Sequence, residues 1–271
     1  MPLEGLLLDM DGVLFHGTKP LPHAISFLRG ISPSRYLLVT NNPSRTPEEV
    51  AERMRRMGFE GVSPGRILTS AQATAEWLAQ RKREFRYFAV GAAGLHEALS
   101  AKGVPDRQRA DYVVVGEGTG LDYEALTTGI NLILKHGATL VATNPDETVD
   151  AMRNGEHVIL PGCGALVAPF AVAAGVEPVV IGKPQPLLYE MALERLGFEA
   201  SHCLMVGDRP DTDIAGAARL GMMTALVRTG RFAVGDPWPQ GMPRPTWDVT
   251  DLVALKTLLE KRFPDVFSMA C

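Results

Sequence analysis

The sequence predicts an α/β fold with a doubly wound parallel-sheet core and an inserted, smaller α/β domain. Short apolar runs of strand length alternate with helical segments along the chain. Several runs end in carboxylates, hydroxyls or amides, which is typical of the ligand-binding edge of an open parallel sheet. The alternation restarts before Phe85, and 271 residues exceed a typical single domain, so we expect two units.

The composition is that of an ordinary globular protein. Hydrophobic residues make up 46% of the chain and charged residues 21%, which disfavours extended disorder. The net charge of -4 leaves no basic surface for nucleic acid. Cys163, Cys203 and Cys271 lie far apart in the sequence, which argues against a disulfide framework or a zinc site.

The sequence shows neither a signal peptide nor a membrane span. We expect no signal peptide, because the first core strand is predicted to begin by Gly5. The most apolar later stretch, Ala165 to Val176, contains Pro169 and is shorter than the roughly 20 residues that a span needs. We therefore expect a soluble cytoplasmic protein without a membrane partner.

The chain is predicted to be organised around a buried strand, Leu6–Leu8, that is followed by Asp9 and Asp11. Residues two apart in a strand point the same way, so both carboxylates are expected to face one pocket at the strand's carboxyl end. Two nearby carboxylates repel each other unless a cation or a shared proton relieves them. Mg²⁺, which prefers oxygen ligands and phosphate substrates, is the simplest relief.

A second strand, expected over Tyr36–Val39, ends in Thr40, Asn41 and Asn42. A hydroxyl and two amides at a sheet edge offer donors for phosphate oxygens, although a plain turn also explains them. The other elements expected in this part are a loop over Phe15–Pro22, a short helix over Ala24–Gly30, a capped helix from Thr46 to Gly58, a strand over Ile67–Ser70 and a helix through Trp77.

The sequence pattern in the middle of the chain predicts the inserted α/β unit. Its expected elements are strands over Phe85–Val90, Tyr112–Val115 and Thr139–Ala142, and a helix over Tyr123–Lys135. The segment Gly116–Gly120 does not match the dinucleotide-binding fingerprint, because Leu121 stands where the third glycine is required. We expect residues 1–78 and 181–271 to form the core and residues 79–180 to form the inserted domain.

Two further polar sites follow apolar runs near the end of the chain. Lys183 comes after Val179–Ile181 and precedes a proline, which keeps it out of a helix interior. A strand over Cys203–Val206 leads into Gly207–Ile214, which holds three acids, although an acidic loop that caps the next helix explains them too. The remaining elements expected are helices over Gln185–Gly197, from Ile214 to Gly221 and over Asp251–Lys261, a strand over Thr224–Val227, a loop over Gly235–Pro245 and an edge strand over Thr246–Val249.

These segments resemble four motifs of the haloacid-dehalogenase-like hydrolases, in the family's order. They are Asp-Met-Asp-Gly-Val from Asp9, Val-Thr-Asn-Asn ending at Asn42, Gly-Lys-Pro around Lys183, and Gly-Asp-Arg-Pro-Asp-Thr-Asp-Ile from Gly207. The chain is most similar to subfamily IIA, the p-nitrophenylphosphatase and NagD-like branch, which carries a large α/β cap of the C2 type. The resemblance implies a Rossmann-like core with residues 79–180 as its cap domain.

The resemblance implies a Mg²⁺-dependent phosphatase that hydrolyses small phosphate monoesters, such as sugar phosphates or nucleotides. Asp9 would be the nucleophile that forms an aspartyl-phosphate, and Asp11 would protonate the leaving oxygen and later deprotonate water. The Asp9 side chain, the Asp11 carbonyl and Asp208 would hold Mg²⁺. Asp213 would support these groups without binding the metal itself.

The resemblance also implies which groups hold the transferring phosphoryl oxygens. These are Lys183, the hydroxyl of Thr40 and the backbone of Asn41. Catalysis of phosphoryl transfer is mostly such positioning and charge stabilisation.

Two glycine- or proline-containing segments, Thr143–Asp146 and Pro161–Leu166, are expected to be loops and resemble parts of the family's cap. Within the first segment, Asn144 and Asp146 are candidate substrate contacts. A turn stabilised by Asx hydrogen bonds explains them equally well.

Two other functions remain open from the sequence. A phosphotransferase or phosphomutase uses the same core, and a phosphate-binding protein without activity would keep the fold. All four motif positions carry functional residue types, which favours the enzyme. The expected partner is a small phosphorylated metabolite rather than nucleic acid or membrane, and relatives that dimerise through the cap leave a homodimer open.

Overall fold

The computed structural model describes residues 2–153 and 156–267, so Cys271 lies outside the described residues. The chain forms two compact units. Unit 1 comprises Met1–Thr40, Pro47–Leu68 and Lys183–Cys271, and unit 2 comprises Asn41–Thr46 and Thr69–Gly182. Each unit has its own sheet and its own hydrophobic core.

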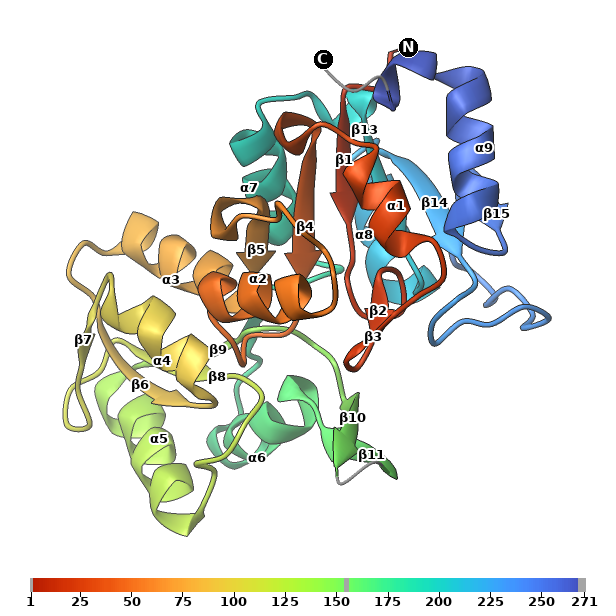
Figure 1. Cartoon of the computed structure of the whole chain (residues 1–271). Helices are drawn as coiled ribbons and strands as arrows, with labels where there is room; N and C mark the ends of the chain where they lie inside the picture. The colour runs from red at the N-terminus through yellow and green to blue at the C-terminus, as the bar shows by residue number, and fades with distance from the viewer. Residues whose placement is uncertain (1, 154–155, 268–271) are drawn as a thin grey trace. The chain divides into compact units, whose positions relative to one another are not determined.

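Unit 1 is built on a six-stranded sheet in the order β15-β14-β13-β1-β4-β5 (Figure 1). Its strands are β1 (Gly5–Leu8), β4 (Tyr36–Thr40), β5 (Ile67–Thr69), β13 (Cys203–Gly207), β14 (Met223–Val227) and β15 (Trp247–Val249). The pairs β1–β4, β1–β13, β13–β14 and β14–β15 are parallel. The chain leaves β1 for β4 on one side and later returns to β13 on the other, so the strand order reverses at β1.

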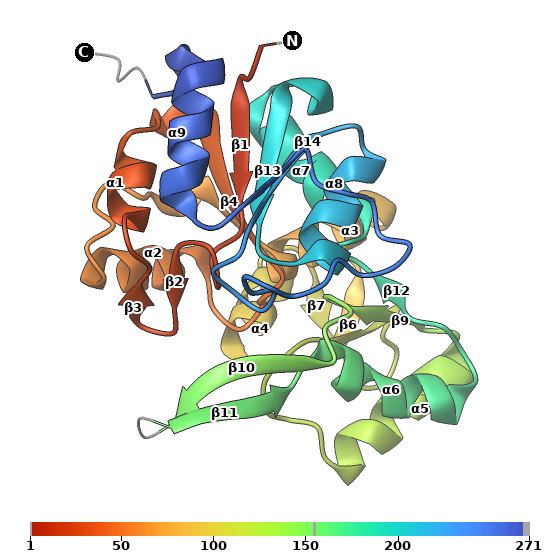
Figure 2. The same cartoon turned by 90° about the vertical axis from the view of Figure 1, so that its right-hand side faces the viewer.

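Helices cover both faces of this sheet (Figure 2). One face carries α1 (Ala24–Arg29), α2 (Pro47–Arg56) and α9 (Leu252–Arg262), and the other carries α7 (Pro186–Leu196) and α8 (Ala215–Arg219). The shorter elements are β2 (Phe15–His16), β3 (Lys19–Pro20), the 3₁₀ turns Pro33–Arg35, Pro64–Arg66, Ala200–His202 and Pro264–Val266, and a π-helical turn at Pro210–Ile214.

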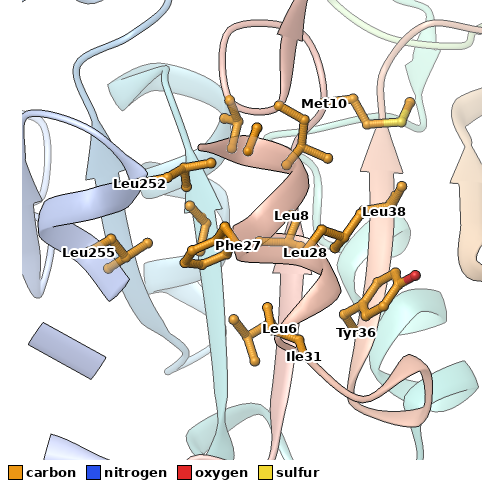
Figure 3. Close-up of a cluster of buried hydrophobic side chains, with 14 of the residues drawn as sticks. Leu6, Leu8, Met10, Phe27, Leu28, Ile31, Tyr36, Leu38, Leu252 and Leu255 are labelled. Atoms are coloured by element: carbon orange, nitrogen blue, oxygen red, sulfur yellow. The ribbon is translucent and has the colours of Figure 1, made fainter. Parts of the chain in front are cut away.

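The central strand β1 is buried over its whole length. Leu6 and Leu8 pack in the same cluster as Phe27 of α1 and Leu252 of α9 (Figure 3), whereas Leu7 is buried outside that cluster. Successive side chains of a strand point to opposite faces, and here each face is covered by helices. A strand covered on both faces has no polar side, which explains why its sequence is a continuous apolar run.

Unit 2 contains a five-stranded sheet in the order β12-β9-β8-β6-β7, with parallel pairings. The strands are β6 (Arg86–Val90), β7 (Val104–Pro105), β8 (Tyr112–Val115), β9 (Thr139–Ala142) and β12 (Val179–Val180). The helices are α3 (Ser70–Arg81), α4 (Ala93–Ser100), α5 (Tyr123–His136) and α6 (Cys163–Ala174). Strands β10 (Thr148–Arg153) and β11 (Glu156–Pro161) form an antiparallel hairpin.

The predicted fold class is confirmed, but the expected loop over Pro161–Leu166 is wrong, because α6 begins at Cys163. The glycines that suggested a loop instead allow a close approach of two backbones. A Cβ atom on Gly162 would lie 2.1 Å from the carbonyl oxygen of Asp146, and one on Gly164 would lie 2.5 Å from that of Pro145.

Besides α6, the elements of unit 2 that were not expected from the sequence include α4, β7 and the β10–β11 hairpin. Helix α4 has only eight residues, and Ala92 at its N-cap makes no side-chain capping bond. Strand β7 has two residues, one of them a proline. Such elements leave little local signal because their stability comes from packing against neighbours.

Helix α3 also groups with unit 2, and the ring of Trp77 lies edge-on to Tyr112 with 6.5 Å between ring centroids. This division differs from the boundary expected at residue 79. The assignment of residues 1–78 and 181–271 as the core and 79–180 as a cap domain stays a prediction.

Among residues 2–153 and 156–267, no helix has the length and apolar character needed to cross a membrane.

Replacing Phe27 by alanine is expected to lower the free energy of unfolding by about 3–5 kcal/mol, because the ring is fully buried and its loss leaves a cavity. Urea denaturation measures the change. Val253→Ala, on an exposed position of α9, is the control and is expected to change stability by less than about 0.5 kcal/mol. Equal losses in the two variants would contradict the packing described.

Candidate active site

Three of the predicted site residues lie at the carboxyl edge of the unit 1 sheet. Asp9 follows β1 directly, Thr40 is the last residue of β4, and Asp208 follows β13. These strands flank the point where the strand order reverses. Connections diverge from such a point and leave a crevice, which is where open α/β sheets bind ligands.

Asp9, Asp208 and Asp213 form a cluster of carboxylates in unit 1, with one oxygen from each lying within 4.8 Å of the others. Asp213 reaches this cluster because the turn at Pro210–Ile214 folds it back, and its Oδ2 accepts a hydrogen bond of 3.1 Å from the backbone N–H of Arg209. A Cβ atom on Gly207 would lie 2.2 Å from the Cβ of Asp213. Glycine is therefore required just before Asp208.

Lys183 supplies the positive charge of the cluster. Its Nζ atom lies 2.8 Å from Oδ1 of Asp9, 2.7 Å from Oδ1 of Asp213 and 3.4 Å from the carbonyl oxygen of Val39. The residue is only 2% exposed. Burial alone would lower the pKa of Lys183, but the two carboxylates raise it above its ordinary value, so the ammonium remains charged.

The carboxylates of the cluster are harder to ionise than ordinary ones. Burial raises the pKa of Asp9 to about 7, although the Lys183 ammonium opposes this rise. Burial, together with the charges of Asp213 and Asp9, raises the pKa of Asp208 well above its ordinary value. One ammonium cannot neutralise three carboxylates, and all the donor atoms are oxygens, so the donor set suits a hard divalent cation such as Mg²⁺.

Two glycines and a backbone amide enclose the carboxylate of Asp208. The N–H of Arg231 donates to its Oδ2 over 2.8 Å. A Cβ atom would lie 1.8 Å from this oxygen if it were built on Gly230 and 2.4 Å if it were built on Gly12, whose φ is +84°. The segment around Gly230 was not predicted from the sequence, where its available signal is a Thr-Gly pair just beyond β14.

Asp11 lies outside the carboxylate cluster and is exposed. Met10, between Asp9 and Asp11, points into the hydrophobic cluster (Figure 3), so the chain keeps the alternation of a strand beyond the end of β1. The charge of Asp11 is close enough to contribute to the raised pKa of Asp9, as the smallest of its causes. Thr40 is buried at the end of β4.

The other three predicted residues come together in unit 2. Nδ2 of Asn41 donates to Oδ2 of Asp146 over 3.0 Å, and Nδ2 of Asn144 donates to the carbonyl oxygen of Asn41 over 2.7 Å. Asn144 also donates to the buried carboxylate of Glu117, a residue that was not predicted from the sequence. The only sequence signal for Glu117 is a charged residue between two glycines, just after a buried strand.

Family models of haloacid dehalogenase-like hydrolases match residues 6–105 and 180–255. The chain is 36% identical over 265 residues to an acid sugar phosphatase of Staphylococcus aureus, with 95% of this chain and 98% of that protein covered.

Two solved structures are also similar. The p-nitrophenyl phosphatase of Archaeoglobus fulgidus matches with a TM-score of 0.85 and 30% identity, over 96% of this chain and 100% of that one. The glycerol phosphate phosphatase of Mycobacterium tuberculosis, in complex with magnesium, matches with a TM-score of 0.84 and 36% identity, over 93% of this chain and 76% of that one. The chain therefore belongs to the haloacid dehalogenase-like hydrolase family, in its p-nitrophenylphosphatase and NagD-like branch.

Proposed function

We propose that this phosphoric monoester hydrolase uses Mg²⁺ to cleave small phosphate monoesters through an aspartyl-phosphate on Asp9. The observation that carries the proposal is the pairing of Asp9 with the buried ammonium of Lys183, beside two further carboxylates. A carboxylate held next to a fixed cation, at the ligand-binding edge of the sheet, is suited to attack an anionic phosphoryl group.

In the first step the Asp9 carboxylate attacks phosphorus, and the bond from phosphorus to the ester oxygen breaks. Asp11 gives its proton to the leaving oxygen. In the second step the ionised Asp11 takes a proton from water, which attacks phosphorus and releases inorganic phosphate and the Asp9 carboxylate. One residue serves both steps because it loses its proton in the first and regains it in the second.

The groups proposed to hold Mg²⁺ are the side chains of Asp9 and Asp208 and the main-chain carbonyl of Asp11. When bound, the cation would offset the repulsion between the anionic nucleophile and the dianionic phosphate. Asp213 is proposed to support the metal ligands without binding Mg²⁺ itself, because its Oδ1 binds the Lys183 ammonium and its Oδ2 accepts a hydrogen bond from the Arg209 N–H.

The transferring phosphoryl oxygens are proposed to bind Lys183, the hydroxyl of Thr40 and the backbone N–H of Asn41. These contacts are worth most in the transition state, where charge spreads over the three equatorial oxygens. Thr40 and Asn41 share one planar peptide group, so the hydroxyl and the N–H come from the same short piece of chain.

The substrate is proposed to be a small phosphorylated metabolite, such as a sugar phosphate, a glycerol phosphate or a nucleotide. The names of the relatives support the first two classes. Residues 79–180 are proposed to act as the cap domain that selects among these substrates.

A homodimer that forms through this domain is part of the proposal. Light scattering coupled to gel filtration tests it, and a monomeric mass at all concentrations would contradict it.

Asp9→Asn is expected to lower turnover of p-nitrophenyl phosphate by at least about 10³-fold, because the variant lacks the attacking carboxylate. The measurement is Mg²⁺-dependent release of p-nitrophenol. Asp211→Asn is the matched control, since Asp211 lies close in sequence to Asp208 and Asp213 but pairs with Arg209 outside the cluster. Activity above a tenth of wild type in Asp9→Asn would exclude the proposed nucleophile.

Hydrolysis and transfer are separated by the fate of the phosphoryl group. With an added alcohol or sugar, a hydrolase is expected to release inorganic phosphate in the same amount as p-nitrophenol. Phosphate that falls short of p-nitrophenol, with a new phosphorylated product, would show a phosphotransferase instead.

Mg²⁺ at about 100 times its dissociation constant is expected to stabilise the folded protein by about 2.7 kcal/mol, which raises its Tm. Thermal unfolding with and without Mg²⁺ measures the rise. Asp208→Asn is expected to lose most of this rise, because it removes a charged ligand, whereas Asp211→Asn keeps it. An equal rise in both variants would argue against a metal held by Asp208.

A further inference from the structure

A second buried polar cluster lies in unit 2. Glu117, which follows β8, is 5% exposed, and Asn144, which follows β9, is fully buried. The backbone N–H of Cys163, at the start of α6, also donates to the Glu117 carboxylate. A charged group is costly to bury, so its retention here needs a structural or functional reason.

The side-chain amide of Asn144 is fully engaged inside unit 2. Its Nδ2 donates to both carboxylate oxygens of Glu117, over 2.9 and 3.1 Å, and to the carbonyl oxygen of Asn41 over 2.7 Å. Its Oδ1 accepts the backbone N–H of Asp146 over 3.0 Å. An amide nitrogen has two hydrogens, and both are used by these partners, so we assign Asn144 no direct contact with substrate.

Asn41 is the residue that this network holds. Its carbonyl oxygen accepts hydrogen bonds from Asn144 and from the hydroxyl of Ser70, which lies 2.5 Å away. Its side chain donates to Asp146. A Cβ atom on Gly182 would lie 2.6 Å from Oδ1 of Asn41, so the backbone packs against it from another side. These contacts fix both the backbone and the side chain of Asn41.

The charge of Glu117 favours the observed orientation of the Asn144 amide. An ionised carboxylate can only accept hydrogen bonds, so it draws the Nδ2 side of the amide toward itself. The Oδ1 side then faces the N–H of Asp146. Burial raises the pKa of Glu117 to about 7, with Asp146 as the nearby charge that adds to the rise and Asn144 opposing it. At pH 8 the carboxylate is mainly ionised.

We propose that Glu117 is a positioning residue that, through the side-chain amide of Asn144, fixes the backbone of Asn41. The inference rests on the proposed function, in which the N–H of Asn41 binds the transferring phosphoryl group. Asn41 is joined to Thr40 by one peptide bond, so a small rotation of Asn41 turns this N–H away from its proposed ligand. Asn144 and Asp146 then act by holding Asn41 rather than by touching substrate.

The first test replaces Glu117 by glutamine at pH 8 and measures hydrolysis of p-nitrophenyl phosphate. Glutamine has nearly the same shape, but its Nε2 donates where an acceptor is needed. We expect kcat to fall at least about tenfold, since a misplaced donor stabilises the transition state less, while KM and the half-saturating Mg²⁺ concentration stay within twofold. A kcat within twofold of wild type would overturn the proposal.

The matched control is Leu140→Ala, which removes a buried side chain from the apolar core of unit 2 without touching the network. It is expected to lower Tm while leaving kcat within twofold. An equal fall of kcat in this control would mean that activity follows the stability of unit 2, which would also overturn the proposal. If Glu117→Gln does not fold, Glu117→Asp takes its place in the test. Aspartate keeps the charge, but its shorter side chain moves the carboxylate away from Asn144.

A double-mutant cycle tests whether Glu117 acts through Asn144. In an Asn144→Ala background, Glu117→Gln is expected to change kcat by less than twofold, because the connection to Asn41 is already broken. Losses that multiply in the double variant would show that the two residues act independently.

Amide hydrogen exchange tests the inference even if the wild type turns over no phosphate ester, in which case the proposed function fails by itself. Exchange in residues 41–46 is expected to quicken at least threefold in Glu117→Gln and to stay unchanged in Leu140→Ala. Equal exchange in wild type and Glu117→Gln would show that the carboxylate does not hold this segment.

Discussion

The candidate site depends on one buried ammonium. The Nζ atom of Lys183 binds Asp9 and Asp213, and it is withdrawn from water. Removing one partner from a buried ion pair leaves an uncompensated charge, which costs about 3–5 kcal/mol, so these side chains stabilise one another. They come from segments that are far apart in the sequence: Asp9 follows β1, Asp213 lies in the turn after β13, and Lys183 precedes α7.

The same electrostatics explain why the site is suited to a cation. Lys183 compensates one negative charge, whereas Asp9, Asp208 and Asp213 supply three when ionised. Burial raises the pKa values of Asp9 and Asp208, and the neighbouring carboxylates add to the rise, so each carboxyl holds its proton more tightly than it would in water. Binding a divalent ion would displace these protons and lower the repulsion between the carboxylates.

Much of this architecture was predictable from local sequence. Leu6–Leu8 was predicted as a strand because it is a continuous apolar run, and Asp9 was identified because it follows this run. Asp208 was identified through the resemblance of Gly207–Ile214 to the family's fourth motif. Glu117 was not predicted, since nothing near it in the sequence shows that the side chain of Asn144 binds its carboxylate. The same holds for α6, whose glycines signal a loop until the neighbouring backbone of Pro145 and Asp146 is known. Side chains whose partners lie on another element carry no periodic signal.

The bounds of unit 2 have a consequence for the exchange of domains between relatives. Unit 2 is not one continuous insertion, because it includes Asn41–Thr46 as well as Thr69–Gly182. A chimera that received only residues 69–182 from a relative would keep its own Asn41 opposite a foreign network, with no guarantee of a carboxylate at position 117. A transferable module has to carry the short segment too. A crossover between residues 46 and 69 would therefore separate two segments of one compact unit.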